Sequence, residues 1–399
     1  MTEKNIISKN YNCAINILSP VHIASGDSYS SYECFYPPPR KDGKRLVKRI
    51  NLSKYFVSLS DDYKEEFLKE IVNPGFKLNE FNKNYNEKTN EEVIRLNKFV
   101  KNKREIKELK LNDFVRYVSL NKTKSSNDIN EHIKTMDSLY IPGSSLKGAI
   151  SNALIYNSIY DEQIEEFIKY NNKKKTKFLK SNQFESKIQS YFSYNDRDPI
   201  KRNVMKFLQV SDSSLAKNPT IFEVVSLLLE YDENNNYKGV SESVNTLVEA
   251  LWYKKKLNTN FRFQYNEDIL DFEGAGAKHI KYLNIDYVKK AAYNFSKDLI
   301  AYESDFARKF GLGYLEEFYK GLNSKNTKET PILRLGWGTG LLSKSVALKI
   351  KNYDEGIYRD MFNVKDSSEY PKSKRIAVTK KEPLEGMPLG WVQLKFEEI

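Results

Sequence analysis

The stretch most informative about the fold reads YIPGSSLKGAISNAL, at residues 140–154. Proline and glycine open it, and apolar residues then recur at the spacing of one helix face, at Leu146, Ile150 and Leu154. A serine just before such a face commonly caps the helix, because its hydroxyl accepts a bond from a free backbone N–H. We therefore expect a loop that enters a helix, with Ser144 or Ser145 as the N-terminal cap.

Two glycine-bounded loops come close to the nucleotide-binding pattern G-x-x-x-x-G-K-[ST] without matching it. In the first loop, Gly143 and Gly148 have the correct spacing, but Ala149 stands where the pattern has its lysine. In the second loop, RLGWGTGLLSKS at residues 334–345, Ser343 replaces the glycine before Lys344. An ATP site would also need an aspartate at the end of an apolar strand as a magnesium partner, and we can place none. Both loops still combine glycines with a lysine before an apolar helix start.

Charge and composition favour a nucleic-acid partner. The 399 residues include 65 Lys and Arg against 53 Asp and Glu, a formal charge of +12, together with 27 Tyr and 22 Phe. Ammonium groups pair with phosphates, and aromatic rings can stack on unpaired bases. Biased genome composition would produce the same counts, so the charge alone decides nothing. The run KKKTK at 173–177, which contains Lys174, is treated as a solvated auxiliary surface.

Several classes of protein are disfavoured by the same counts. Cys13 and Cys34 lack C-x-x-C spacing, and the three histidines, His22, His132 and His279, lie far apart in the sequence. These patterns predict no disulfide framework, no metal site and no cofactor. No apolar run approaches the roughly 20 residues that cross a bilayer, and the first residues form no apolar signal core. We therefore expect a cytoplasmic protein without a membrane partner.

Strand and helix patterns alternate in a mixed order that predicts an α+β fold. Strands are expected near 11–17, 206–214, 220–233 and 386–399, and helices near 285–310 and 313–322. Residues 113–122 and 129–137 are predicted to form one strand pair, and residues 246–256 and 259–265 another. Residues 346–381 read as a polar stretch.

The length and the pattern together predict three parts, because single cores stop growing at roughly 250 to 300 residues. A first module is expected from residues 1–60 plus 110–240. A charged helical lobe at 61–109 interrupts it, and a second module with the glycine-rich loop spans 241–399. We expect no continuous parallel sheet.

Four short stretches resemble the RAMP superfamily of CRISPR-associated RNA-binding proteins. They are LSPVHIASGD at 18–27, IPGSSLKGAI at 141–150, KFLQVSDSS at 206–214 and LGWGTGLLSKSV at 335–346. Their order, the chain length and the terminal PLGWVQL at 388–394 most resemble the family of fifth subunits of the type III-A (Csm) effector complex. The second stretch is the most specific of the four, and QVSDSS alone is weak.

The resemblance implies tandem ferredoxin-like, RRM-like modules with helical insertions. It implies a non-catalytic subunit that binds CRISPR RNA, caps the 3′-end side of the ribonucleoprotein and is needed for 3′-end maturation and antiviral defence. The implied partners are the CRISPR RNA, the other RAMP backbone subunits of the Csm complex and host nucleases.

The two glycine-bounded loops would then hold RNA phosphates, because glycines allow close approach and free N–H groups favour an anion. The RNA-binding residues expected there are Gly143, Ser144, Ser145, Lys147, Arg334, Gly336, Gly338, Gly340 and Lys344. From spacing alone, an ordinary capped helix would be the simpler explanation of the first loop, and the resemblance reverses that preference. For the second loop the alternative is a tight turn that packs the loop against a sheet. Trp337 is expected to be a core residue rather than a stacking platform.

The alternative function is a metal-independent endoribonuclease that processes precursor CRISPR RNA, with His22 as its general acid or base. A lone histidine after a strand is more often packed or hydrogen-bonded, and no second catalytic residue is tied to it. Asp27 and Asp212 could bind a metal, but nothing groups them with further ligands, so we expect each to cap a turn or loop.

Overall fold

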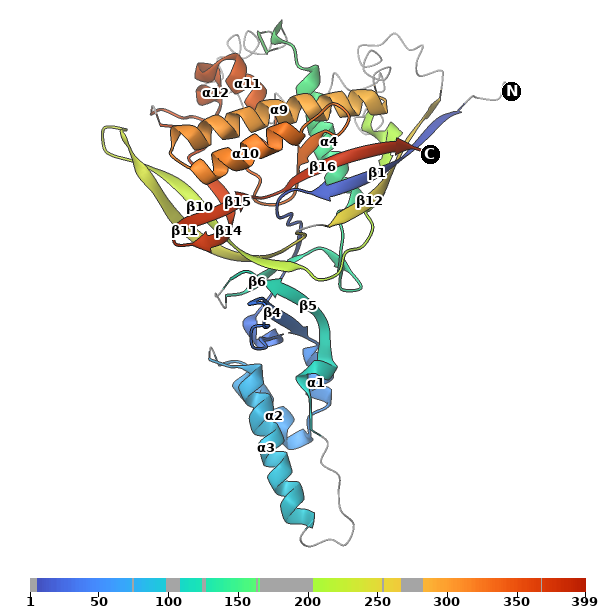
Figure 1. Cartoon of the computed structure of the whole chain (residues 1–399), viewed down its shortest axis with the longest axis vertical. Helices are drawn as coiled ribbons and strands as arrows, with labels where there is room; N and C mark the ends of the chain where they lie inside the picture. Colours follow the sequence, from blue (N-terminus) through green and yellow to red (C-terminus); the bar gives the residue numbers. More distant parts are fainter. Residues whose placement is uncertain are drawn as a thin grey trace.

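The computed structural model describes residues 6–73, 75–97, 108–123, 127–162, 164–165, 204–252, 255–266, 283–366 and 368–399. Two sheets and a group of helices form the body, and a helical lobe extends from it (Figure 1). The mixed order of helices and strands confirms the predicted α+β fold. The run at 173–177 lies outside the described residues.

The first sheet has the ferredoxin-like arrangement that the family resemblance implies. Its strands β1 (Ile6–Ile17), β9 (Leu208–Val210), β12 (Lys256–Asn266), β13 (Ile332–Arg334) and β16 (Trp391–Glu398) lie in the order β13-β16-β1-β12-β9. Each neighbouring pair is antiparallel. With helices α4 (Gly143–Ser158) and α9 (Ile285–Lys309), the strands β1, β9, β12 and β16 follow the βαββαβ order of that fold.

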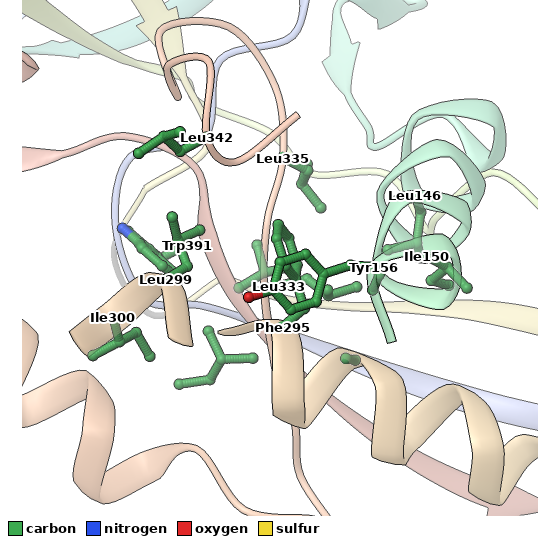
Figure 2. Close-up of a cluster of buried hydrophobic side chains, with 14 of the residues drawn as sticks. Leu146, Ile150, Tyr156, Phe295, Leu299, Ile300, Leu333, Leu335, Leu342 and Trp391 are labelled. Carbon is green, nitrogen blue, oxygen red and sulfur yellow. The ribbon is translucent and has the colours of Figure 1, made fainter. Parts of the chain in front are cut away.

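Helices α4 and α9 pack together over this sheet, and α10 (Gly313–Lys325) packs beside α9. The rings of Tyr156 on α4 and Phe295 on α9 lie 4.8 Å apart, and the Tyr156 hydroxyl donates to Asp298 at 2.8 Å. Figure 2 shows Leu335 and Leu342 of the glycine-rich loop in the same buried cluster as Leu146 of α4. The core therefore connects both glycine-bounded loops to one helical layer.

The second sheet has nine strands, and a long hairpin forms its centre. The order β2-β6-β11-β10-β5-β4-β3 places the hairpin β10 (Thr220–Tyr231) and β11 (Tyr237–Ala250) at its centre. The other strands on this path are β2 (Ala24–Tyr29), β3 (Cys34–Phe35), β4 (Arg45–Ile50), β5 (Val115–Asn121) and β6 (Ile129–His132). Strand β14 (Ser373–Lys381) pairs with β10 and with β15 (Leu384–Pro388). A separate short pair joins β7 (Lys134–Thr135) and β8 (Ser138–Leu139).

Both predicted strand pairs are wrong. Strands β5 and β6 lie on opposite sides of the β10–β11 hairpin, where β5 contacts β10 and β6 contacts β11, each in parallel. Strands β11 and β12 belong to different sheets. In both cases the adjacent sequence suggested a hairpin, but the partner strand comes from a distant part of the chain. The boundary expected at residue 240 falls inside β11 and does not separate the two sheets.

The helical lobe projects from strands β4 and β5 (Figure 1). It contains α1 (Leu52–Val57), α2 (Asp61–Glu70) and α3 (Leu78–Asn97), so its helices begin before the expected residue 61. Its aromatic core is separate from that of the body and includes Tyr55, Phe67, Phe81 and Tyr85. Residues 98–107 lie outside the described part.

The stretch 346–381 contains elements that the sequence analysis missed. These are α11 (Ala347–Tyr353), α12 (Glu355–Met361) and β14. The side chain of Asp354 caps α12 by accepting from the N–H of Ile357 at 3.0 Å, and Tyr358 is buried. Helices of seven residues are too short to show a clear hydrophobic period, so the polar sequence did not indicate them.

Candidate nucleic-acid interface

The two glycine-bounded loops, about 190 positions apart in the sequence, meet at one cavity of about 410 Å³. Ser145, Gly148, Ala149 and Asn152 line it from α4, and Arg334–Trp337, Ser343 and Lys344 line it from the glycine-rich loop. Ile23 and Ala24, at the start of β2, complete the wall. We call this cavity the α4 pocket. It brings together both sequence signals, but five of the expected residues do not line it: Gly143, Ser144, Lys147, Gly338 and Gly340.

The first turn of α4 is held by an aspartate and not by a serine. The cap residue is Pro142, and Ser144 and Ser145 lie inside the helix, so the predicted serine cap is wrong. The N–H of Gly143 instead donates to Oδ1 of Asp212 at 2.8 Å. A Cβ at Gly143 would lie 2.1 Å from the backbone oxygen of Val210, so only glycine lets α4 start against the end of β9.

The glycine-rich loop packs against the segment that follows β1. The N–H of Trp337 donates to the backbone oxygen of His22 at 2.7 Å, and Gly336 has a φ of 91°. A Cβ on Gly336 would lie 2.5 Å from that same oxygen. Gly338 and Gly340 also have positive φ, but a Cβ at Gly340 would meet nothing within 4 Å. These turns bring the loop beside α4.

Arg334 is a buried structural residue rather than an exposed cation. It is 5% exposed, and its Nη1 lies 3.0 Å from Oε1 of Glu303 on α9. Its Nε donates to the backbone oxygen of Leu389 at 3.0 Å. Burial alone raises the pKa of Glu303, but Lys374 and Arg334 together lower it, so the carboxylate is charged. The guanidinium therefore ties the loop to α9, which leaves it little capacity to bind RNA.

Lys344 is the cation best placed in the α4 pocket. Its side chain is exposed, and it forms no ion pair with a carboxylate in the described ranges. Partial desolvation in the pocket lowers the pKa of Lys344, and the nearby guanidinium groups of Arg334 and Arg375 lower it further. A bound phosphate would relieve that repulsion. Lys147 is half-buried on the adjacent face of α4, and burial lowers its pKa.

Arg375 is a site residue that sequence reasoning missed. It lies on β14, is exposed, and places its guanidinium 4.6 Å from the centre of the Trp337 ring. Trp337 is half-buried against the cluster of Phe222, Val224 and Val248, consistent with the core role expected of it. No local sequence pattern marked Arg375, and only the pairing of β14 with β10 puts it beside the loop.

His22 is placed for packing and not for proton transfer. It is 1% exposed, and its Nδ1 lies 2.7 Å from the backbone oxygen of Glu249. Burial lowers the pKa of His22 to about 4, so the ring is neutral near pH 7. Its ring centre lies 6.0 Å from that of His132, which the sequence analysis had treated as distant. Burial likewise lowers the pKa of His132 to about 3.

The two aspartates considered as metal ligands, Asp212 and Asp27, lie in different surroundings. Asp212 caps helix α4 rather than the turn or loop expected, and Asp27 is exposed on β2. In the part of the chain that the structure describes, no three His, Cys, Asp or Glu side chains gather as a metal site. Across those same residues, no helix is long and apolar enough to traverse a bilayer.

The ferredoxin-like sheet, the inserted hairpin and the two converging loops define a class of α+β proteins in which a βαββαβ core carries large insertions. The chain belongs to the RAMP superfamily, whose sequence profile matches residues 14–343. The superfamily predicted from the four short stretches is thereby confirmed.

Individual relatives point to one branch of the superfamily. The chain is 26% identical over 411 residues to the CRISPR system Cms protein Csm5 of Methanocaldococcus jannaschii, covering 96% of this chain and 88% of the relative. It resembles a chain in the cryo-EM structure of a type III-A Csm–crRNA–target RNA ternary complex, with 20% identity and a TM-score of 0.59. That match covers 98% of this chain and 100% of the other.

A crystal structure of Csm5 from T. onnurineus shows the same fold, with 19% identity and a TM-score of 0.50. It covers 95% of this chain and 99% of that one. The predicted resemblance to the fifth subunit of the type III-A complex is therefore confirmed.

Proposed function

We propose that this chain is an RNA-binding subunit of a type III-A CRISPR effector ribonucleoprotein, and that the α4 pocket holds the RNA sugar-phosphate backbone. The observation that carries the proposal is the meeting of two distant glycine-bounded loops around one pocket, with Lys344 unpaired among the described residues. A glycine-rich loop beside an unpaired lysine suits an extended polyanion. The match to Csm5 and to a chain of a Csm–crRNA complex supports the same assignment.

The finer parts of the proposal concern the position of the subunit. As in the fifth-subunit family, it caps the 3′-end side of the CRISPR RNA beside other RAMP subunits, and it supports 3′-end maturation and antiviral defence by recruiting host nucleases. Gly336, Gly338 and Gly340 shape the loop, and Ser145 and Gly148 form the opposite wall. Ser144 and Lys147 extend the contact surface along α4 beyond the pocket.

The test is the salt dependence of RNA affinity. Each lysine that contacts a phosphate releases counterions on binding, so its loss should flatten the log–log slope by about 0.7 to 1. Lys344→Ala should weaken binding to unrelated RNA sequences about equally, and Lys147→Ala should do the same. Lys320→Ala is the matched control, because that exposed lysine on α10 pairs with Glu316 away from the pocket.

Gly148→Glu provides a second variant that does not depend on a lysine. Gly148 lines the α4 pocket within a helix, and a Cβ there meets nothing within 4 Å. The new carboxylate should therefore repel RNA without disturbing the fold, which circular dichroism can verify. Unchanged RNA affinity and salt slope in Lys344→Ala and Gly148→Glu, alone and in the assembled complex, would show that the loops are only structural turns.

We propose that the subunit is not itself a nuclease, since His22 is buried and neutral and Asp212 caps a helix. Purified protein should leave labelled repeat RNA intact with or without a chelator. Cleavage that is lost in His22→Ala or Asp212→Ala would favour the endoribonuclease instead.

A further inference from the structure

A second, smaller cavity of about 180 Å³ lies between the glycine-rich loop and β14. Gly338–Leu342 line it from the loop, and Pro371 and Ser373–Arg375 line it at the start of β14. Glu303 and Arg334 also contribute to its wall. We call it the β14 pocket. It shares Arg334 with the α4 pocket, so the two cavities adjoin through the glycine-rich loop.

The lining of the β14 pocket carries an excess of positive charge. Three cations face one carboxylate: Glu303 pairs with Arg334 at 3.0 Å and with Lys374 at 2.7 Å. Arg375 forms no ion pair with a carboxylate among the described residues and lies over Trp337. Arg334 and Lys374 are themselves largely buried, with side chains 3% and 13% exposed. Two buried cations against one buried carboxylate leave an excess of one positive charge, which is costly unless an anion completes it, and the exposed Arg375 adds a further cation at the pocket.

The loop also supplies free hydrogen-bond donors at this pocket. In the described structure, the backbone N–H groups of Gly338, Gly340, Leu341 and Leu342 donate to no protein acceptor. Buried backbone N–H groups are nearly always paired, and Gly338 and Leu342 are buried. Consecutive free N–H groups beside fixed cations are the donors that phosphate sites use.

We infer that the β14 pocket binds a phosphate monoester group. The formal excess of two positive charges matches a monoester, which carries nearly two negative charges at pH 7, better than an internal phosphodiester, which carries one. The anion site rests on the pocket's own lining. The further step, that the group is the terminal phosphate of an RNA lying in the adjoining α4 pocket, rests on the proposed function.

Binding of three RNAs of one sequence to the full chain tests the source of the phosphate. The RNAs carry a 5′-phosphate, a 3′-phosphate or hydroxyl groups at both ends, and salt is held constant. One phosphorylated end should bind about tenfold tighter than the hydroxyl-ended RNA, the size expected of charge-assisted hydrogen bonds. Arg375→Gln should remove that preference. Lys380→Gln, an exposed lysine of the same strand that pairs with Glu385, should retain it.

Gly148→Glu separates this inference from the proposed function, because Gly148 lines only the α4 pocket. That variant should weaken binding of all three RNAs. The ratios between their affinities, measured on the residual binding, should stay unchanged. Loss of RNA binding in Gly148→Glu together with equal affinity for all three ends in the wild type would support the proposed function and overturn the terminal-phosphate assignment.

Phosphorus NMR titration of the wild type with inorganic phosphate and with a nucleoside monophosphate tests the site without RNA. Saturable binding that Arg375→Gln weakens, at constant ionic strength, supports the monoester site. If this binding occurs without any preference for an RNA end, the site takes a small phosphate compound and the RNA-end assignment is rejected. Absence of both saturable phosphate binding and end preference overturns the inference entirely.

Discussion

The N–H of Trp337 and the backbone oxygen of His22 lie 2.7 Å apart, and this hydrogen bond joins the glycine-rich loop to the segment that leaves β1. The same oxygen limits the residue before the tryptophan, because a Cβ on Gly336 would lie 2.5 Å from it. The hydrogen bond and the close approach of Gly336 to His22 hold the loop in the position where it forms one wall of the α4 pocket.

Gly336→Ala should lower the free energy of unfolding by about 3 kcal/mol. Its φ of 91° is unfavourable for alanine, and the added methyl group meets backbone that can move little. Gly340→Ala is the control, because Gly340 has a φ of 82° but open space around its Cβ position. Urea unfolding of both variants measures the difference. Equal losses would mean that the contact with His22 has no energetic weight.

Asp212→Ala should lower the free energy of unfolding by about 1 kcal/mol, the usual effect of losing a helix cap. The carboxylate accepts the N–H of Gly143 at the start of α4, where no serine side chain replaces it. Asp27→Ala, at an exposed position on β2, should change stability by less than about 0.5 kcal/mol. A similar small effect in both variants would contradict the capping role.

Arg334→Met should destabilise the protein by about 3 kcal/mol or more, because Glu303 and the backbone oxygen of Leu389 would each lose a buried hydrogen bond. A double variant that adds Glu303→Gln should be less stable still, because Lys374 would then lose its buried carboxylate partner. The comparison is Arg308→Met. Arg308 lies on α9, the helix that carries Glu303, and its exposed ion pair with Asp305 should contribute at most about 1 kcal/mol to stability. Thermal and urea unfolding check each value, and a mild effect of Arg334→Met would remove the basis for calling it structural.

Stability should decrease as pH falls below about 6.5. The folded protein holds the pKa of His22 near 4, below the ordinary value of 6.5, so between these values the unfolded chain binds more protons than the folded one. His22 therefore contributes about 3 kcal/mol to the free energy of unfolding. This contribution is complete above pH 6.5 and is lost as pH falls towards 4.

His22→Asn should flatten this dependence, since its amide can still donate to the backbone oxygen of Glu249 but does not titrate. Urea unfolding at pH 7, 6 and 5 compares the variant with the wild type. His132, with a folded pKa of about 3, should continue to produce part of the slope in the variant. Parallel curves for the two proteins would show that His22 does not titrate as the buried geometry requires.

Local sequence was enough to predict α4, α9, α10 and the turns of the glycine-rich loop, because these depend on residue spacing within one segment. The buried positions of Leu146, Ile150 and Leu154 agree with the helix face that was read from their spacing. The short motifs also identified the RAMP superfamily. By contrast, α11 and α12 were missed, since seven-residue helices show little period.

The sequence by itself therefore determined the helices α4, α9 and α10, the family and the glycine-rich turns of residues 334–345. Only the tertiary structure decided which strands pair and which cations are free. Strand β1 lies between β12, from the middle of the chain, and β16, from its end. Hydrogen bonding across a sheet depends on proximity in space and not in sequence.

Arg334 and Lys344 stand ten positions apart in one loop, yet the first is buried against Glu303 and the second is exposed. Arg375 reaches that loop only because β14 pairs with β10. Burial and charge balance arise where distant segments pack, so no local pattern could assign them.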